Sequence, residues 1–150
     1  MSCAGCGCAI ADEAGCQRIF DELIARDFSN VLYGRWHRTL VDVYALQHPE
    51  RYCASAKSLA AHLGGLCCAI ERGGDAETYR ALQRWLNGPS ALVRPPLPAA
   101  RGAVTIADLL PAGDPREYGD TLGRWAQSTW AAYSPLHGLA RASLDAANSR

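Results

Sequence analysis

Residues 16–28 read CQRIFDELIARDF, and the spacing of the apolar side chains in this stretch indicates the fold class. These side chains recur at intervals of three and four residues: Cys16, Ile19, Phe20, Leu23 and Ile24. Such spacing places them along one face of an α-helix, which has about 3.6 residues per turn. The pattern therefore predicts a first helix from about residue 13 to residue 26.

The same helical period continues through most of the chain. Val31 begins a second predicted helix, which ends before Pro49 because a residue that precedes proline avoids the α region. Further helices are predicted from their apolar periodicity and capping residues at positions 55–73, 75–87, 105–110, 114–133 and from 134 toward the polar C-terminal end. No segment alternates between apolar and polar residues as a strand does. We expect an all-α helical bundle of about five to six helices.

The chain is predicted to form a single helical domain over residues 1–150, with two segments outside the main helices. Residues 1–12 form a cysteine-rich N-terminal tail. Residues 88–114 form a proline-rich connection, and residues 88–103 within it have no apolar period. This composition is typical of an extended crossover loop.

Charge and composition exclude several classes of function. The 150 residues include 15 basic and 15 acidic side chains, so no net positive field favours nucleic acid or an anionic membrane. No apolar run reaches the roughly 18 residues of a membrane span, and the N-terminus lacks the pattern of a signal peptide. We expect a cytoplasmic protein, in which seven cysteines indicate metal binding, catalysis or packing rather than a disulfide framework.

The cysteines of the first sixteen residues have a spacing that suits a metal ion. Cys3 and Cys6 are separated by two residues, and such a pair of thiolates converges on one tetrahedral ion. Cys16 lies in the first turn of the predicted first helix, where unpaired N–H groups and the helix dipole favour a thiolate. Zinc is the predicted cofactor. An iron–sulfur cluster is the alternative, because Cys8 supplies a fourth thiolate.

A histidine is the preferred fourth ligand. If the first two helices are antiparallel, Cys16 lies level with about residue 41, and His48 lies beyond that point, beside the N-terminal tail. His48 is therefore predicted to join Cys3, Cys6 and Cys16, and Cys8 is its substitute. His37 lies on the same helical face about 16 Å from His48, too far to share an ion with it.

The remaining polar residues of these helices suggest a second site. His37, Asp42 and His62 are predicted to lie within one turn of one another, where Asp42 orients an imidazole or binds a second metal. Asp42 pairing with Arg38 is the simpler alternative. With Tyr44, these residues are the candidates for acid–base catalysis, but nothing in the sequence selects a substrate.

Several motifs together resemble a family of small bacterial all-helical proteins of uncharacterised function. They are Cys3-Ala-Gly-Cys6-Gly7, Cys16 with Phe20–Leu23, Tyr33-Gly34, His37-Arg38, Val41-Asp42 with Tyr44, Gln47-His48-Pro49, Lys57-Ser58, His62-Leu63, Trp125-Ala126, Trp130 and His137. The resemblance implies no reaction. It singles out Cys3, Cys6, Cys16 and the histidines and leaves out Cys8, which favours His48 as the fourth ligand.

The sequence therefore predicts a small metal-binding protein whose zinc is mainly structural. A groove lined by His37, Asp42, Tyr44, Lys57 and His62 is predicted to bind an unknown protein partner or a small molecule. The alternatives are a zinc-dependent enzyme that acts on a small substrate and a redox sensor based on thiols or an iron–sulfur cluster. The sequence does not indicate an oligomeric state.

Overall fold

Helices account for all the regular secondary structure in residues 1–89 and 91–149, the residues that the computed structural model describes. They are α1 (Glu13–Ser29), α2 (Val31–Gly34), α3 (His37–Gln47), α4 (Pro49–Tyr52), α5 (Ala56–Glu71), α6 (Ala76–Asn87), α7 (Ile106–Leu109), α8 (Pro115–Ala132), the 3-10 turn η1 (Ser134–Leu136) and α9 (His137–Asn148). The predicted all-α class is confirmed. Not one of these helices is long and apolar enough to cross a membrane.

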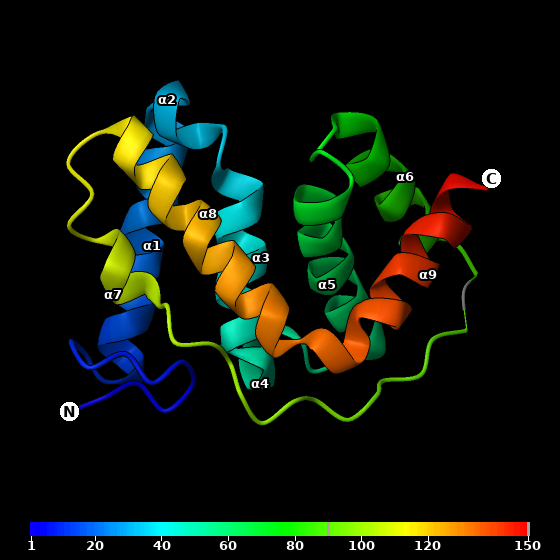
Figure 1. Cartoon of the computed structure of the whole chain (residues 1–150), viewed down its shortest axis with the longest axis horizontal. Helices are drawn as coiled ribbons and strands as arrows, with labels where there is room; N and C mark the ends of the chain where they lie inside the picture. The colour runs from blue at the N-terminus through cyan, green and yellow to red at the C-terminus, as the bar shows by residue number, and fades with distance from the viewer. Residues whose placement is uncertain (90, 150) are drawn as a thin grey trace.

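Helices α3 and α5 pack together at the centre of the bundle (Figure 1). On one side α1 and α8 pack against α3, and α2 and α7 pack against α1 and α8; on the other side α6 and α9 flank α5. The buried apolar side chains of both groups form one continuous cluster, in which Trp125 and Tyr44 are among the largest. Each amphipathic helix therefore buries its apolar face against α3, α5 or a direct neighbour of these two.

Two glycines in the middle of α5 allow its close contacts. A Cβ atom on Gly64 would lie 2.9 Å from Cδ2 of Leu82 in α6. A Cβ atom on Gly65 would overlap the carboxylate of Asp42 in α3. Each glycine costs about 1 kcal/mol of helix stability relative to alanine, and here the smaller side chain lets the neighbouring helices approach.

The predicted second helix is wrong in one respect, because it is broken into α2 and α3. The break lies at Arg35 and Trp36, which form a turn closed by a hydrogen bond from the Trp36 N–H to the Tyr33 carbonyl oxygen, 3.0 Å long. Gly34 lies so close to α1 that a Cβ atom would be 2.6 Å from the Asp27 carbonyl oxygen. The Trp36 ring packs against Gly119 of α8. These tertiary contacts make the chain turn at a point where the sequence pattern predicts that the helix continues.

Most other helix boundaries agree with the capping residues. Asp12, Ser55, Asp75 and Asp114 each accept a hydrogen bond from a backbone N–H of the first turn of the following helix. Helix α3 ends before Pro49, as predicted. Pro49 also begins the short helix α4, which the sequence analysis missed.

Residues 91–105 of the proline-rich connection form no helix or strand and run along one end of the bundle past α4 (Figure 1). Gln47, which has no exposed surface, ties it to the core. Its Nε2 donates to the carbonyl oxygens of Arg101 and Val104, at 2.9 and 2.7 Å, and its Oε1 accepts from Nε1 of Trp125 at 2.9 Å. One buried amide therefore joins α3, α8 and the connection.

We predict that Gln47→Ala lowers the free energy of unfolding by about 3 kcal/mol or more, because the substitution leaves buried donors and acceptors without partners. Urea denaturation followed by circular dichroism measures the change. Gln83→Ala is the control, because Gln83 is exposed on α6 and its side chain, among the described residues, bonds only to Asn87. It should change the stability by less than about 0.5 kcal/mol. Equal effects of the two substitutions would contradict the role of Gln47.

Two buried tyrosines give a matched pair of variants. The Tyr133 hydroxyl donates to the Leu46 carbonyl oxygen, whereas the Tyr118 hydroxyl is buried with no hydrogen-bond partner among the described residues. Tyr133→Phe should therefore lower the free energy of unfolding by about 1–2 kcal/mol, and Tyr118→Phe should leave it unchanged or raise it slightly. Thermal denaturation of both variants checks the prediction, and a larger loss in Tyr118→Phe would refute it.

Candidate metal centre

The N-terminal tail folds into a compact loop that buries its cysteines. The N–H of Cys3 donates to the Cys8 carbonyl oxygen at 2.9 Å, and the N–H of Gly7 donates to the Cys3 carbonyl oxygen at 2.8 Å. Gly7 has a φ of 79°, a left-handed conformation that glycine adopts without strain. The loop buries the side chains of both Cys3 and Cys6.

Helices α1 and α3 place Cys16 and His48 beside this loop. The Asp12 side chain caps α1, so that Cys16 lies in the first turn with no exposed surface. His48 follows the last residue of α3 and is also buried. The four candidate ligand atoms of Cys3, Cys6, Cys16 and His48 all lie within 4.8 Å of one another. The structure thus brings together the four residues that the sequence analysis selected.

Three of the six distances between these atoms match those of a tetrahedral zinc site. Zinc lies about 2.3 Å from thiolate sulfur and about 2.0–2.1 Å from imidazole nitrogen, so two sulfur ligands are about 3.8 Å apart and a sulfur–nitrogen pair about 3.6 Å apart. The Sγ atoms of Cys6 and Cys16 are 3.8 Å apart. The Nε2 atom of His48 lies 3.5 Å from Sγ of Cys3 and 3.6 Å from Sγ of Cys16.

The imidazole of His48 is oriented as a ligand. Its Nδ1 lies 2.7 Å from the Tyr44 carbonyl oxygen, which can only accept a hydrogen bond. Nδ1 therefore carries the proton of the neutral ring, and the lone pair of Nε2 faces the three sulfur atoms. A metal-binding histidine usually donates its other N–H in this way.

The contacts within the cluster favour a thiolate at Cys16. The hydrogen bond with Cys6 is the main cause that lowers the pKa of Cys16 well below its ordinary value, and those with His48 and Tyr44 lower it further. The same hydrogen bond with Cys16, together with burial, raises the pKa of Cys6. Of Cys6 and Cys16, Cys16 is therefore the residue that more readily carries negative charge.

Cys8 is buried in the same loop but is not one of the four clustered residues. Its Sγ contacts the Ala11 carbonyl oxygen at 3.9 Å. Burial raises the pKa of the Cys8 thiol, which keeps it protonated. The structure thus places His48, rather than its predicted substitute Cys8, with the other three ligands.

The predicted cluster of His37, Asp42 and His62 forms only in part. Oδ1 of Asp42 lies 3.0 Å from Nδ1 of His62, and its Oδ2 accepts from Nε of Arg38 at 2.9 Å. His37 instead contacts Oδ2 of Asp27 on α1 at 3.2 Å. His37 and Asp42 are five residues apart, which turns their side chains about 140° from each other around α3. Asp42 orients one imidazole, and both its oxygens are occupied.

The other residues of the predicted groove also have separate surroundings. The Tyr44 hydroxyl lies 3.4 Å from Sγ of Cys16, one of the four candidate metal ligands. Lys57 is exposed near the start of α5. The candidates for acid–base catalysis therefore lie in three separate places: beside the four candidate ligands, in the Asp42–His62 pair and in the Asp27–His37 pair.

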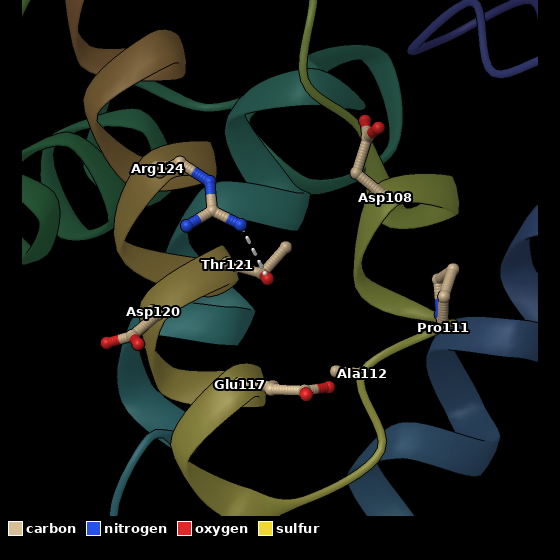
Figure 2. Close-up of a pocket in the computed structure, with 7 residues that line it drawn as sticks. All are labelled: Asp108, Pro111, Ala112, Glu117, Asp120, Thr121 and Arg124. Atoms are coloured by element: carbon tan, nitrogen blue, oxygen red, sulfur yellow. Dashed lines mark hydrogen bonds between the residues drawn. The ribbon is translucent and has the colours of Figure 1, made fainter.

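The hollow that adjoins the cluster is small, and a larger one lies elsewhere on the described surface. The hollow beside Tyr44 and His48 has a volume of about 20 Å³, room for about one water molecule. A larger hollow of about 270 Å³ lies between α7 and α8 (Figure 2) and contains no predicted site residue. Its carboxylates Asp108 and Glu117 accept hydrogen bonds from the backbone N–H groups of Thr105 and Gly113.

A family match agrees with the sequence resemblance. A model of the family of unknown function DUF5946 matches residues 1–134, which include all four clustered residues. The chain belongs to this family. No curated protein and no solved structure matches the chain, so the chemistry of the site rests on its own geometry.

Two residues support the cluster in a way that the sequence pattern did not indicate. Gly5 was not singled out, although the His48 ring packs directly on it. Tyr44 was assigned to a groove, whereas it contacts both Cys16 and His48. Its place four residues before His48, on the same helical face, was the available signal.

We predict that Gly5→Ala lowers the free energy of unfolding by about 1–3 kcal/mol, the usual cost of overpacking. The added Cβ atom would lie 2.5 Å from Cδ2 of His48. Gly123→Ala in α8 is the control, because its Cβ atom would meet nothing within 4 Å, and it should raise the stability by up to about 1 kcal/mol. Urea titration measures both, and an unchanged stability of Gly5→Ala would contradict the packing argument.

Proposed function

We propose that this chain is a zinc-binding protein in which Cys3, Cys6, Cys16 and His48 hold one ion. One observation carries the proposal: three sulfur atoms and the lone pair of an imidazole nitrogen face one another in a buried space. Electron-rich atoms in such an arrangement repel one another unless a cation or protons lie between them. A divalent cation satisfies all four at once.

Zinc is favoured over an iron–sulfur cluster by the donor set. Three thiolates and one imidazole form a common structural zinc site, whereas iron–sulfur clusters are usually held by four thiolates. Cys8, the fourth thiolate for such a cluster, lies outside the group.

The zinc is proposed to be structural rather than catalytic. A catalytic ion keeps one coordination position for water or substrate, but this cluster offers four protein ligands. The adjoining hollow of about 20 Å³ also leaves no room for an organic substrate. When bound, the ion would link the loop of residues 1–12 to the ends of α1 and α3, because two ligands come from the loop and two from the helices.

The cytoplasm is the proposed location, supported by seven cysteines that are all free thiols. In this proposal the biological role is the binding of a protein partner or a small molecule by the helical body, and the ion keeps the N-terminal loop in place.

The test is the metal content of the chain purified without chelators. We expect about one zinc per chain by elemental analysis, and loss of that zinc in Cys3→Ser, Cys6→Ser, Cys16→Ser and His48→Asn. Cys8→Ser is the matched control, a buried cysteine of the same loop that should keep the zinc. Removal of the metal by a chelator should lower the melting temperature of the wild type. Protein without bound metal that is equally stable with and without added zinc would reject the proposal.

X-ray absorption at the zinc edge separates the structural role from the catalytic one. Three sulfur ligands and one nitrogen ligand support the structural role, and an oxygen ligand in place of one of them supports an enzyme. A brown protein that contains iron would instead support the iron–sulfur alternative.

A further inference from the structure

Tyr44, in the last turn of α3, packs against the proposed metal centre. Its ring lies between the rings of Phe20 and His48, with centroids 3.9 Å away on each side and interplanar angles of 3° and 23°. The Tyr52 ring packs edge-on against the Tyr44 ring, with their centroids 5.9 Å apart. Only 1% of Tyr44 is exposed, so the ring has no room to turn its hydroxyl elsewhere.

Two different groups of Tyr44 contact two different ligands. Its hydroxyl lies 3.4 Å from Sγ of Cys16, and its carbonyl oxygen accepts from Nδ1 of His48 at 2.7 Å. Cys16 is the only hydrogen-bond partner of this hydroxyl among the described residues. A phenol is protonated at neutral pH, so toward a thiolate it is the donor.

We propose that Tyr44 is a positioning residue whose hydroxyl donates to the thiolate of Cys16 and makes that sulfur less reactive. The inference rests on the proposed zinc site. It distinguishes this site from a thiol sensor, whose cysteine must react readily with oxidants. A thiolate reacts through its lone pairs, and a hydrogen bond to a charged sulfur stabilises those electrons. Neither Cys3 nor Cys6 has such a donor from a side-chain hydroxyl among the described contacts, so the protection is specific to Cys16.

The hydrogen bond is tested in protein loaded with Co²⁺. Cobalt bound to thiolates has a sulfur-to-metal charge-transfer absorption band, and the position of this band depends on the energy of the sulfur lone pairs. Loss of the donor raises the energy of the sulfur lone pairs, so we expect this band to move to lower energy in Tyr44→Phe. Tyr52→Phe is the matched control, because Tyr52 belongs to the same aromatic stack but its hydroxyl bonds to Gln17. Its band should stay in place. Identical bands in all three proteins would overturn the hydrogen bond.

The reduced reactivity is tested with hydrogen peroxide on the zinc-loaded protein. The thiolate sulfur of Cys16 attacks one peroxide oxygen, the O–O bond breaks, hydroxide leaves and a sulfenic acid forms. Loss of the thiolate releases zinc, which a chromogenic chelator detects. We expect release to be roughly tenfold faster in Tyr44→Phe than in the wild type or Tyr52→Phe, which corresponds to about 1.4 kcal/mol in the barrier. Equal rates would overturn the protective role.

A measurement on the wild type covers the case in which Tyr44→Phe does not fold. With NMR-active cadmium in the site, the Tyr44 hydroxyl proton should exchange slowly and show a scalar coupling to the metal through sulfur. A hydroxyl proton without this coupling would overturn the inference. A wild type that binds neither Co²⁺ nor cadmium would instead reject the metal site, which keeps the two failures distinct.

Discussion

The C-terminal end of α3 is buried, and its polar groups all require partners. Tyr44, Gln47 and His48 lie within five consecutive positions and are almost inaccessible to solvent. Gln47 binds the proline-rich connection and Trp125, whereas His48 contacts Cys3 of the N-terminal loop and Tyr44 contacts Cys16 at the start of α1. A buried polar group without a partner costs about 1–3 kcal/mol. The two longest described segments without regular structure, residues 1–12 and 91–105, are thus both held to this one end of a helix.

This arrangement gives each residue of the Gln-His-Pro motif a physical role. Gln47 is the hydrogen-bonding centre of the connection, His48 presents Nε2 to the sulfurs, and Pro49 begins α4 at a position where no N–H is needed. The proline ends α3 immediately after these two side chains. The end of the helix is therefore both a structural junction and the edge of the candidate metal centre.

The helical elements were largely predictable because their signals are local. Apolar periodicity and capping residues such as Asp12 and Ser55 act within a few positions of the helix that they define. The break between α2 and α3 was not predictable in this way. It depends on the approach of Gly34 to α1 and of Trp36 to Gly119, more than 80 positions later in the chain.

For the candidate site, two simple arguments were enough to select the four residues. The three cysteines are close together in the sequence, and an antiparallel arrangement of two consecutive helices brings His48 beside them. The predicted pairing of Asp42 with Arg38 and its contact with His62 are both observed, but the partners of His37 and Tyr44 could not be selected from the chain alone. Those partners depend on how α3 is rotated about its axis and on how closely α1 and α5 pack against it. A shift of a few ångströms would give a side chain a different partner. Residues close together in the sequence determine where each helix begins and ends. The packing of the helices determines which of several nearby polar groups a side chain contacts.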